Sequence, residues 1–220
     1  MTSLPTPLLS LASQQLTGRG RGANIWLSPS GCLQFSLLVR TSLATVPPFK
    51  IVFVQYLFAL AVAEACREES VLGSKIGGRV RLKWPNDLYA VTGTDDGDRK
   101  KIGGILVNTS FTGNQVDIVI GQCSVVSMTE GANDLDPTCT GCGLNVSTPP
   151  PIVSLNRLLT DRFANQLSVE RIAATIMVVF EGMWSTFTSH GGSFDPFMDL
   201  YLKRWLHSCV IPCASFAPYL

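Results

Sequence analysis

The sequence predicts an α+β fold, on two observations. Short runs that alternate between polar and apolar residues, which are typical of strands, occur at 33–40, 79–84, 101–111 and 116–121. Longer stretches with apolar residues at helical spacing occur at 50–69, 168–188 and 195–206. Because the two kinds of segment do not alternate regularly along the chain, we expect an α+β fold and no series of β–α–β units.

Length and composition indicate one domain, or one domain with a small appendage. The chain has 220 residues, 46% of them hydrophobic and 15% charged, which is ample for a buried core. The formal net charge of +1 gives no reason to expect a nucleic-acid partner. The seven cysteines are irregularly spaced, which favours reduced thiols over a disulfide framework.

Neither a membrane span nor a secretory leader is expected. The longest apolar run, 51–63, is interrupted by Gln55 and falls short of the roughly 20 residues that cross a bilayer. The first 16 residues lack a basic residue before their apolar stretch, which a secretory signal would carry. We therefore expect a cytoplasmic protein with no membrane partner.

In the first half of the chain the elements are separated by clear turn signals. Residues 1–17 contain Pro5 and Pro7 and are expected to be irregular. The strand at 33–40 leaves a glycine-rich loop, and the apolar segment 50–69 is expected to be a buried helix. A strand at 79–84 is followed by a polar turn at 92–100.

The second half begins with a hairpin. Gly113-Asn114 joins the strands 101–111 and 116–121, because these residues readily adopt the positive φ angles of tight turns. A short strand at 143–147 and a proline-rich loop at 148–151 follow. Ser168 is a suitable N-cap for the next helix, and Pro196 fits the first turn of the last one.

A glycine- and arginine-rich loop is the first candidate site, in the stretch TGRGRGANIWLSPSGCL at 17–33. Glycines let the backbone approach a ligand closely, and Arg19 and Arg21 offer donors for carboxylate or phosphate. Trp26 could stack on a planar ring. The alternative is a flexible basic turn. The stretch lacks the pattern of a Walker A loop and the context of a dinucleotide fingerprint.

The second candidate is KWPND at 83–87. Pro85 stops regular structure and fixes a bend, with Asn86 and Asp87 directly behind it. Asp87 could hold a metal ion and Asn86 could bridge oxygens. The alternative is a strand end with a tight turn.

Two further stretches carry glycines at strand starts. In KIGG, Lys101 precedes Gly103 and Gly104, and glycines inside a strand often mark the close approach of a ligand. GCGLNV at 141–146 repeats this pattern. By itself, the run from Arg99 to Lys101 could equally be a solvated set of charges.

Taken together, GRGRGANIWLSPSGCL, RLKWPNDLY, KIGGILVN and CGLNVS, in this order, resemble the catalytic domain of the biotin protein ligases, the holocarboxylase synthetase group of eukaryotes. LYLKRWLHS at 200–208 is similar to the end of that domain. The resemblance covers residues 15–208. It implies a mixed sheet flanked by helices, as in class II aminoacyl-tRNA synthetases and lipoate ligases.

The resemblance also implies an activity. Biotin and ATP would form biotinyl-5′-AMP, with Mg²⁺ bound to the nucleotide, and a lysine of a carboxylase's biotin-carrier domain would then accept the biotinyl group. No protein nucleophile is required, because placement and charge stabilisation supply the catalysis.

The roles that the resemblance implies fall into three overlapping sets. Catalysis is expected from Arg19, Lys83, Asn86, Asp87 and Lys101, with Asp87 as a Mg²⁺ ligand. Biotin is expected to contact Gln15, Arg19, Gly20, Arg21, Lys101, Gly103, Gly104 and Gly143. ATP is expected to contact Arg21, Trp26, Lys83, Asn86 and Asn145, with Trp26 against the adenine and the two arginines closing over the adenylate.

Three departures from the family pattern stand out. The expected upstream biotin-binding block is absent, so 1–14 are assigned to an irregular N-terminal segment. Residues 209–220 form an atypical tail where relatives continue into a small SH3-like barrel. Residues 122–141 interrupt IGCGLNV and are interpreted as an insert, which we expect to bulge outward with Gly121 near Cys142.

Two alternative functions and one alternative site remain open at this point. The chain could bind biotin, a carrier domain or a partner ligase without turnover, or it could be a lipoate or octanoate ligase. CTGC at 139–142 together with His207, Cys209 and Cys213 could bind zinc, although the second group is irregularly spaced. The sequence does not indicate the oligomeric state.

Overall fold

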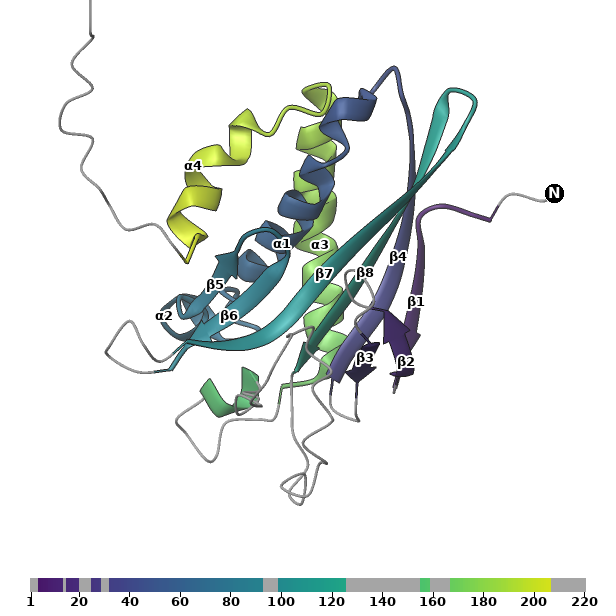
Figure 1. Ribbon diagram of the computed structural model, residues 1–220. Coiled ribbons are helices and arrows are strands. Elements are labelled where there is room, and N and C mark those ends of the chain that lie inside the picture. The colour runs from purple at the N-terminus through teal and green to yellow at the C-terminus, as the bar shows by residue number, and fades with distance from the viewer. Residues whose placement is uncertain are drawn as a thin grey trace, which may run out of the picture.

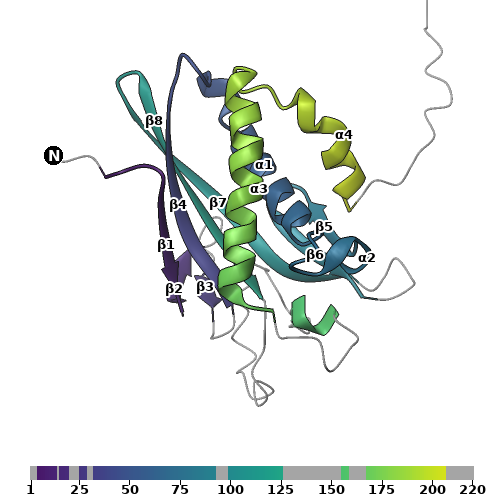
Figure 2. The same cartoon turned by 180° about the vertical axis from the view of Figure 1, so that it is seen from behind.

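The described residues form a six-stranded antiparallel sheet with helices on one face, and a separate two-stranded sheet (Figures 1 and 2). The computed structural model describes residues 4–13, 15–19, 25–28, 32–92, 99–125, 155–158 and 167–206, with the backbone alone for 17–19, 25–28, 122–125 and 156–157. The strand order in the sheet is β1-β4-β8-β7-β6-β5. This arrangement confirms the predicted α+β class.

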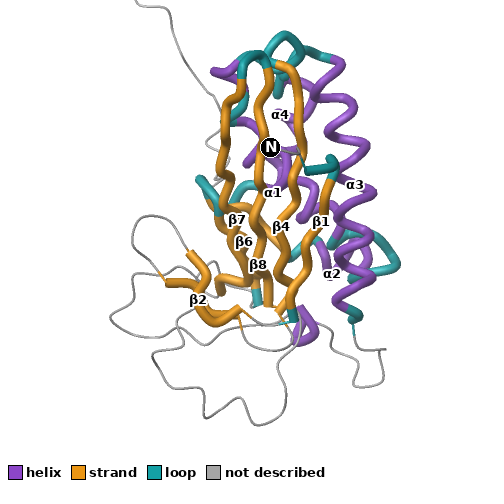
Figure 3. Tube along the Cα trace, turned by 90° about the vertical axis from the view of Figure 1, so that its right-hand side faces the viewer, coloured by secondary structure: helices purple, strands orange, loops and turns teal. Residues whose placement is uncertain are grey.

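Strands β5 to β8 pair in the order of the chain, whereas β1 and β4 are joined to them across longer separations in sequence. β1 (Leu8–Ala12) pairs with β4 (Cys32–Ser42), which also pairs with β8 (Gln115–Val125). β7 (Arg99–Thr112) joins β8 to β6 (Asp87–Val91), and β5 (Val80–Lys83) forms the far edge. A separate hairpin of β2 (Gln15–Arg19) and β3 (Ile25–Ser28) lies on the side of the sheet away from the helices (Figure 3).

The helical layer is built around α1 (Phe53–Ala65), which follows a short turn η1 (Pro48–Lys50). α1 is apolar on nearly all sides, as expected for a helix that packs between a sheet and other helices. Its outer neighbours are α3 (Val169–Ser189) and α4 (Asp195–Arg204), and Figure 2 shows α3 on the outside. Two short elements complete the layer, α2 (Gly73–Gly77) and η3 (Leu155–Leu158).

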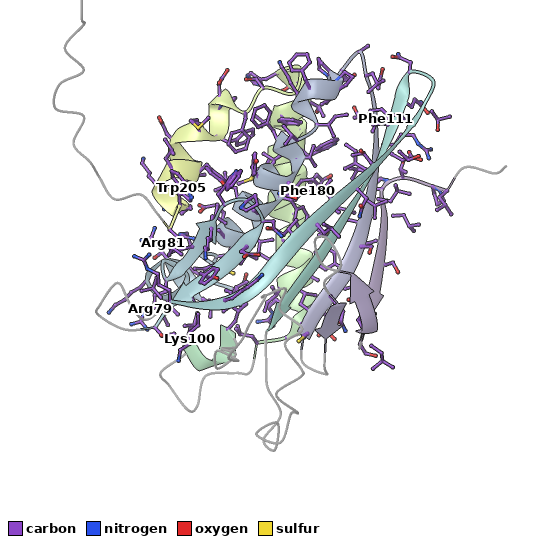
Figure 4. The ribbon with its side chains drawn as sticks, viewed as in Figure 1. Arg79, Arg81, Lys100, Phe111, Phe180 and Trp205 are labelled. Carbon is purple, nitrogen blue, oxygen red and sulfur yellow. The ribbon has the colours of Figure 1, made fainter. Side chains whose placement is uncertain are left out.

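The core lies between the sheet and α1. Leu33, Leu57, Phe58 and Ile118 have no exposed surface. Phe58 meets the ring of Phe180 from α3, with the centroids 4.9 Å apart, and Figure 4 shows Phe180 between the helices and the sheet. Burial of side chains of this size contributes about 1.5–3 kcal/mol each to folding.

Sequence signals account for several element boundaries. The Ser168 hydroxyl accepts a hydrogen bond from the Arg171 amide at 3.2 Å and caps α3, as predicted. Pro196 lies in the first turn of α4. The predicted hairpin turn is confirmed, because Thr112 pairs with Gln115 and Gly113 has φ of 58°.

The prediction that residues 1–17 are irregular is wrong where the structure describes them. β1 occupies Leu8–Ala12 and β2 begins at Gln15, so the segment expected to be irregular over 1–14 contains an edge strand. All but one of the β1 residues are exposed, because an edge strand over an open face buries little. Its sequence, LLSLA, therefore shows no alternation of polar and apolar residues.

Other element boundaries differ from those that the sequence predicted. The helix expected over 50–69 begins at Phe53 and ends at Ala65, and the polar turn expected over 92–100 gives way to β7 at Arg99. β6 and α2 were not predicted. β8 extends to Val125, so the first four residues of the proposed insert 122–141 belong to the sheet. The rest of that insert and the strand expected at 143–147 lie outside the described residues.

Two helical stretches, Pro48–Ala65 and Val169–Ser189, are long and apolar enough to cross a membrane. Core helices of soluble proteins meet the same criterion, and 56% of the first stretch is buried inside the fold. Both stretches contribute residues to the core between the helices and the sheet.

Cys66, at the end of α1, is expected to make stability pH-dependent. It is 1% exposed, and burial raises the pKa of its thiol to about 12. Below the ordinary thiol pKa, near 8.5, the thiol is neutral in both states. Above it, ionisation favours the unfolded chain, so this contribution to stability is lost as pH rises toward 12.

The measurement is the free energy of unfolding in urea between pH 7.5 and pH 10.5 for the parent and Cys66→Ala. The alanine variant should be less stable at the lower pH, because it leaves a cavity. The difference between the two proteins should shrink as pH rises. Parallel curves would contradict the assignment.

Candidate active site

A row of paired residues crosses the sheet on the face opposite the helices, hereafter the outer face. The register pairs Lys83 with Asp87, Asp87 with Gly104, Gly104 with Cys123 and Cys123 with Gln34. Residues directly opposite each other in antiparallel strands project to the same face. Because Leu82, Leu88 and Leu33 occupy the neighbouring row and are buried against the helices, the row from Lys83 to Gln34 faces outward.

The centre of this row is an ion pair between β6 and β7. Lys101 Nζ lies 2.7 Å from Asp87 Oδ1, and the two side chains are 3% and 18% exposed. Removing charges from water is costly, so a buried lysine requires a carboxylate partner of this kind. The pair therefore places an ammonium and a carboxylate on the outer face beside the bare backbone of Gly104.

A β-bulge directs Lys101 to this face. The pairing steps from Leu88 opposite Gly103 to Tyr89 opposite Lys101, so Ile102 is an extra residue on β7. Without it, strict alternation would place Lys101 on the same side as Gly103 and Ile105, which face the helices. With it, Ile102 enters the core at 1% exposure and Lys101 faces outward opposite Tyr89.

Lys83 brings a second cation to the same surface. Its Nζ lies 4.9 Å from the centroid of the Tyr89 ring and 3.4 Å from the Tyr89 hydroxyl. Arg81, opposite Tyr89, donates to the Lys203 carbonyl at 2.7 Å. Figure 4 shows Arg81 and Arg79 at the β5 edge, whereas Lys100, near the start of β7, pairs with the buried Ala90 and belongs to the row that faces the helices. This corner of the sheet is therefore rich in positive charge and suited to anionic groups.

Helix α1 anchors the turn between β5 and β6. Gln55 Nε2 donates to the Pro85 carbonyl at 2.8 Å, and Trp84 Nε1 donates to the Tyr56 hydroxyl at 3.1 Å. On the sheet side, the Ile105 amide donates to the Asn86 carbonyl at 2.9 Å. The turn is thus fixed from both sides, which sets the positions of Lys83 and Asp87 at its two ends.

Tyr56 is itself held by an aromatic cluster. Its ring centroid lies 6.3 Å from that of Phe194 and 5.9 Å from that of Tyr201 in α4. Burial, and to a lesser degree the neighbouring Tyr56, raise the pKa of Tyr201 to about 12. Beyond α4, the Leu206 amide donates to the Leu82 carbonyl at 2.7 Å and covers the β5 edge, beside Trp205 (Figure 4).

The structure places seven of the predicted site residues, with their side chains or as glycines, in strands and in the turn between β5 and β6. Lys83, Asp87, Lys101 and Gly104 come together on the outer face, and Asn86 lies in the turn beside them. Gly103 belongs to the row that faces the helices, opposite Leu88, so Gly104 is the glycine that leaves the outer face bare. Gln15 is exposed at the start of β2.

The remaining predicted residues are not placed beside this group by the described part of the structure. Arg19 and Trp26 lie in β2 and β3, where the backbone alone is described. Gly20, Arg21, Gly143 and Asn145 lie outside the described residues, as do both parts of the possible zinc site. Among the described residues, no group of three or more His, Cys, Asp or Glu residues could hold a metal ion.

Four residues at this site were missed by sequence reasoning: Gln34, Gln55, Tyr56 and Tyr89. Tyr89 could have been found, because Asp87 and Tyr89 alternate with the apolar Leu88 and Ala90 along one strand. Gln55 was noted as an interruption of an apolar run, and a lone polar residue in a buried helix indicates a specific partner.

The chain resembles known proteins over most of its length. It is 31% identical over 207 residues to the biotin–protein ligase of Homo sapiens, which covers 91% of this chain and 24% of that protein. It is 30% identical over 209 residues to biotin–protein ligase 2 of Arabidopsis thaliana, covering 94% and 54%. The chain thus spans between about a quarter and about half of the length of these relatives.

Two solved structures of biotin protein ligases have a fold similar to that of this chain. The biotin protein ligase of Leishmania major in complex with biotin gives a TM-score of 0.64 at 18% identity, covering 91% of this chain and 71% of that one. The biotin protein ligase of Aquifex aeolicus in complex with biotin and ATP also gives 0.64, at 19% identity, covering 93% and 71%.

The family assignment follows from the sequence match. The model of the Biotin/lipoate A/B protein ligase family matches residues 1–123, more than half of the 220 residues. This range contains the row from Lys83 to Gln34 and both partners of the buried ion pair. The resemblance inferred from the four sequence blocks is therefore confirmed, and the chain belongs to the biotin/lipoate A/B protein ligase family.

Proposed function

We propose that this chain activates biotin with ATP to form biotinyl-5′-AMP, and then transfers the biotinyl group to a lysine of a carboxylase's biotin-carrier domain. The observation that carries the proposal is the buried pair of Lys101 and Asp87 beside Lys83 and Gly104 on the outer face. Family membership and the relatives named biotin–protein ligase support this choice of substrate.

In the first step, an oxygen of the biotin carboxylate would attack the α-phosphorus of ATP, and pyrophosphate would leave. Both reactants are anions, so the main obstacle is charge repulsion. Lys101 and Lys83 would offset the negative charge that accumulates at the phosphate, because both cations are held in place before the reaction. The bare backbone at Gly104 would let the acyl chain lie close to the strand.

In the second step, the neutral ε-amine of the acceptor lysine would attack the acyl carbon, the bond between the acyl carbon and the phosphate oxygen would break with AMP as the leaving group, and the proton released from the nitrogen would pass to water. Asp87 would bind the ammonium form of the incoming lysine before that lysine loses its proton, since this carboxylate lies on the outer face beside Lys101. The same carboxylate would contribute one ligand to Mg²⁺ on the nucleotide, an ion that typically uses one or two carboxylates together with phosphates and waters.

The test is incubation of the chain with labelled biotin, ATP and a biotin-carrier domain. We expect ATP-dependent label on the acceptor lysine and release of AMP and pyrophosphate. Binding of biotin without labelling would indicate a non-catalytic protein. Labelling with lipoate or octanoate in preference to biotin would indicate the other branch of the family.

Replacing Lys101 should prevent activation. Lys101→Ala removes a cation next to the reacting phosphate, and loss of one such stabilising group costs on the order of 10²–10³ in rate. The measurement is biotin-dependent exchange of pyrophosphate into ATP, with circular dichroism to check folding. Lys100→Ala, one residue away on β7, is the matched control and should retain activity. A Lys101→Ala variant with the parent's exchange rate would remove this residue from the mechanism.

The hydrogen bonds from α1 to the turn between β5 and β6 should affect the rate of the reaction more than the stability of the fold. Tyr56→Phe keeps the aromatic cluster but removes the acceptor for Trp84 Nε1, and Gln55→Leu removes the donor to Pro85. Each change should lower kcat/KM about tenfold, because a misplaced turn displaces Lys83 and Asp87. Val52→Ala, at an exposed residue before α1, is the control. Parent values of kcat/KM in both variants would contradict a positioning role.

Deletion of 122–141 should raise activity. In the present chain Cys123 lies opposite Gly104, whereas in the deleted chain Gly143 would take the position of Cys123. A glycine there would leave the outer face bare on two neighbouring strands. The control is deletion of 126–145, which also removes twenty residues but retains Cys123 and removes Gly143. Equal rates of biotin activation in the parent and the first variant would show that the segment does not obstruct the site.

A further inference from the structure

Gln34 is a buried polar residue whose position in the core-forming strand β4 has no packing explanation. It is 3% exposed, and its neighbours Leu33 and Phe35 face the helices. Gln34 instead faces outward, in the row that contains Gly104 and Asp87. Buried side-chain amides are normally hydrogen-bonded at both ends, because an unpaired carbonyl in an apolar site is unfavourable.

The amide of Gln34 is satisfied at one end. Its Nε2 donates to the carbonyl of Ala12 in β1 at 3.0 Å. Since a backbone carbonyl can only accept, the amide nitrogen must point to β1, and this fixes the orientation of the side chain. Oε1 is therefore directed elsewhere, and among the described residues none donates a hydrogen bond to this buried oxygen.

The position of Gln34 places this acceptor within reach of a molecule bound at the candidate active site. Gln34 and Gly104 both pair with Cys123, so they are separated by two strand spacings, roughly 10 Å. Asp87 lies one strand further along the same row. A small molecule with its acidic end at Lys101, the ion-pair partner of Asp87, and its ring at β4 would therefore reach Gln34.

Because Gln34 Oε1 is a hydrogen-bond acceptor, it limits which ring can bind next to it. A carbonyl oxygen needs a hydrogen-bond donor, and the ureido ring of biotin carries two N–H groups. The dithiolane of a lipoyl group and the methyl end of an octanoyl group carry none. A site built around a buried acceptor rejects ligands that leave it unpaired more strongly than a hydrophobic pocket rejects a small change of shape.

We propose that Gln34 is a specificity-determining residue whose Oε1 accepts a hydrogen bond from a ureido N–H of biotin. The inference rests on the proposed function and adds to it a reason why this member of the family would select a ureido ring over a dithiolane or alkyl chain. Gln34 acts on substrate binding, and the charged groups at the other end of the row act on the phosphate.

The test compares biotin with its two mono-N-methyl derivatives in calorimetric titrations of the full chain and of Gln34→Leu. Loss of one hydrogen bond between neutral groups in a buried site weakens binding about tenfold. We expect that loss for biotin in Gln34→Leu. Methylation of one ureido nitrogen should weaken binding to the parent, and should have little further effect on Gln34→Leu. Octanoate should bind Gln34→Leu at least as well as it binds the parent.

The matched control is Ser36→Ala, which lies two residues along β4 on the same face and should bind biotin like the parent. If Gln34→Leu does not fold, Gln34→Met, which is close to glutamine in size and also lacks the acceptor, takes its place, and methylation of a ureido nitrogen should weaken binding to this variant less than it weakens binding to the parent. A Gln34→Leu variant with the parent's biotin affinity would overturn the inference and leave the proposed function intact. A parent that binds no biotin would overturn both.

Discussion

The geometry of the candidate site depends on the ion pair between Lys101 and Asp87. A lysine ammonium that is 3% exposed is stable only beside a carboxylate, and the partner at 2.7 Å comes from the neighbouring strand. The pair therefore requires a fixed register between β6 and β7. The bulge at Ile102 meets this requirement, because it sends an apolar side chain to the core and the adjacent lysine to the outer face.

The helical layer supports this arrangement from the other side of the sheet. α1 fills the core with apolar residues and also supplies Gln55 and Tyr56, which hold the turn between β5 and β6. α4 stabilises the position of α1, since Arg204 and Glu64 form an ion pair in which Arg204 Nη2 lies 3.2 Å from Glu64 Oε2. A few specific hydrogen bonds from α1 to the turn between β5 and β6 thus make the positions of the cations on the opposite face depend on how the helices pack.

The sequence was most informative where one residue type has few structural uses. The Gly113-Asn114 turn, the Ser168 cap and the first turn of α4 at Pro196 were all predictable. Edge strands such as β1 were not, because a strand in which only one of five residues is even partly buried carries no alternation. The KWPND turn was recognised as unusual, but its attachment to α1 depends on contacts between residues about 30 positions apart.

The candidate site likewise has features that could be predicted from the sequence and features that could not. Lys83, Asp87, Lys101 and Gly104 could be named from motifs, whereas the face each occupies depends on a register and a bulge that no local pattern reveals. Strict alternation would have assigned Lys101 to the core. Gln34 could not be identified from sequence, because its role follows from a backbone carbonyl on β1 and from an oxygen that is left without a described partner.

The central claim is that acyl-adenylate chemistry takes place on the outer face of the sheet, along the row from Lys83 to Gln34. A crystal structure of the full chain with a sulfamoyl-linked analogue of biotinyl-5′-AMP tests it directly. The account predicts the sulfamoyl group beside Lys101 Nζ and the ureido ring beside Gln34 Oε1. An analogue bound on the helical face, or bound with its ring directed away from β4, would contradict it.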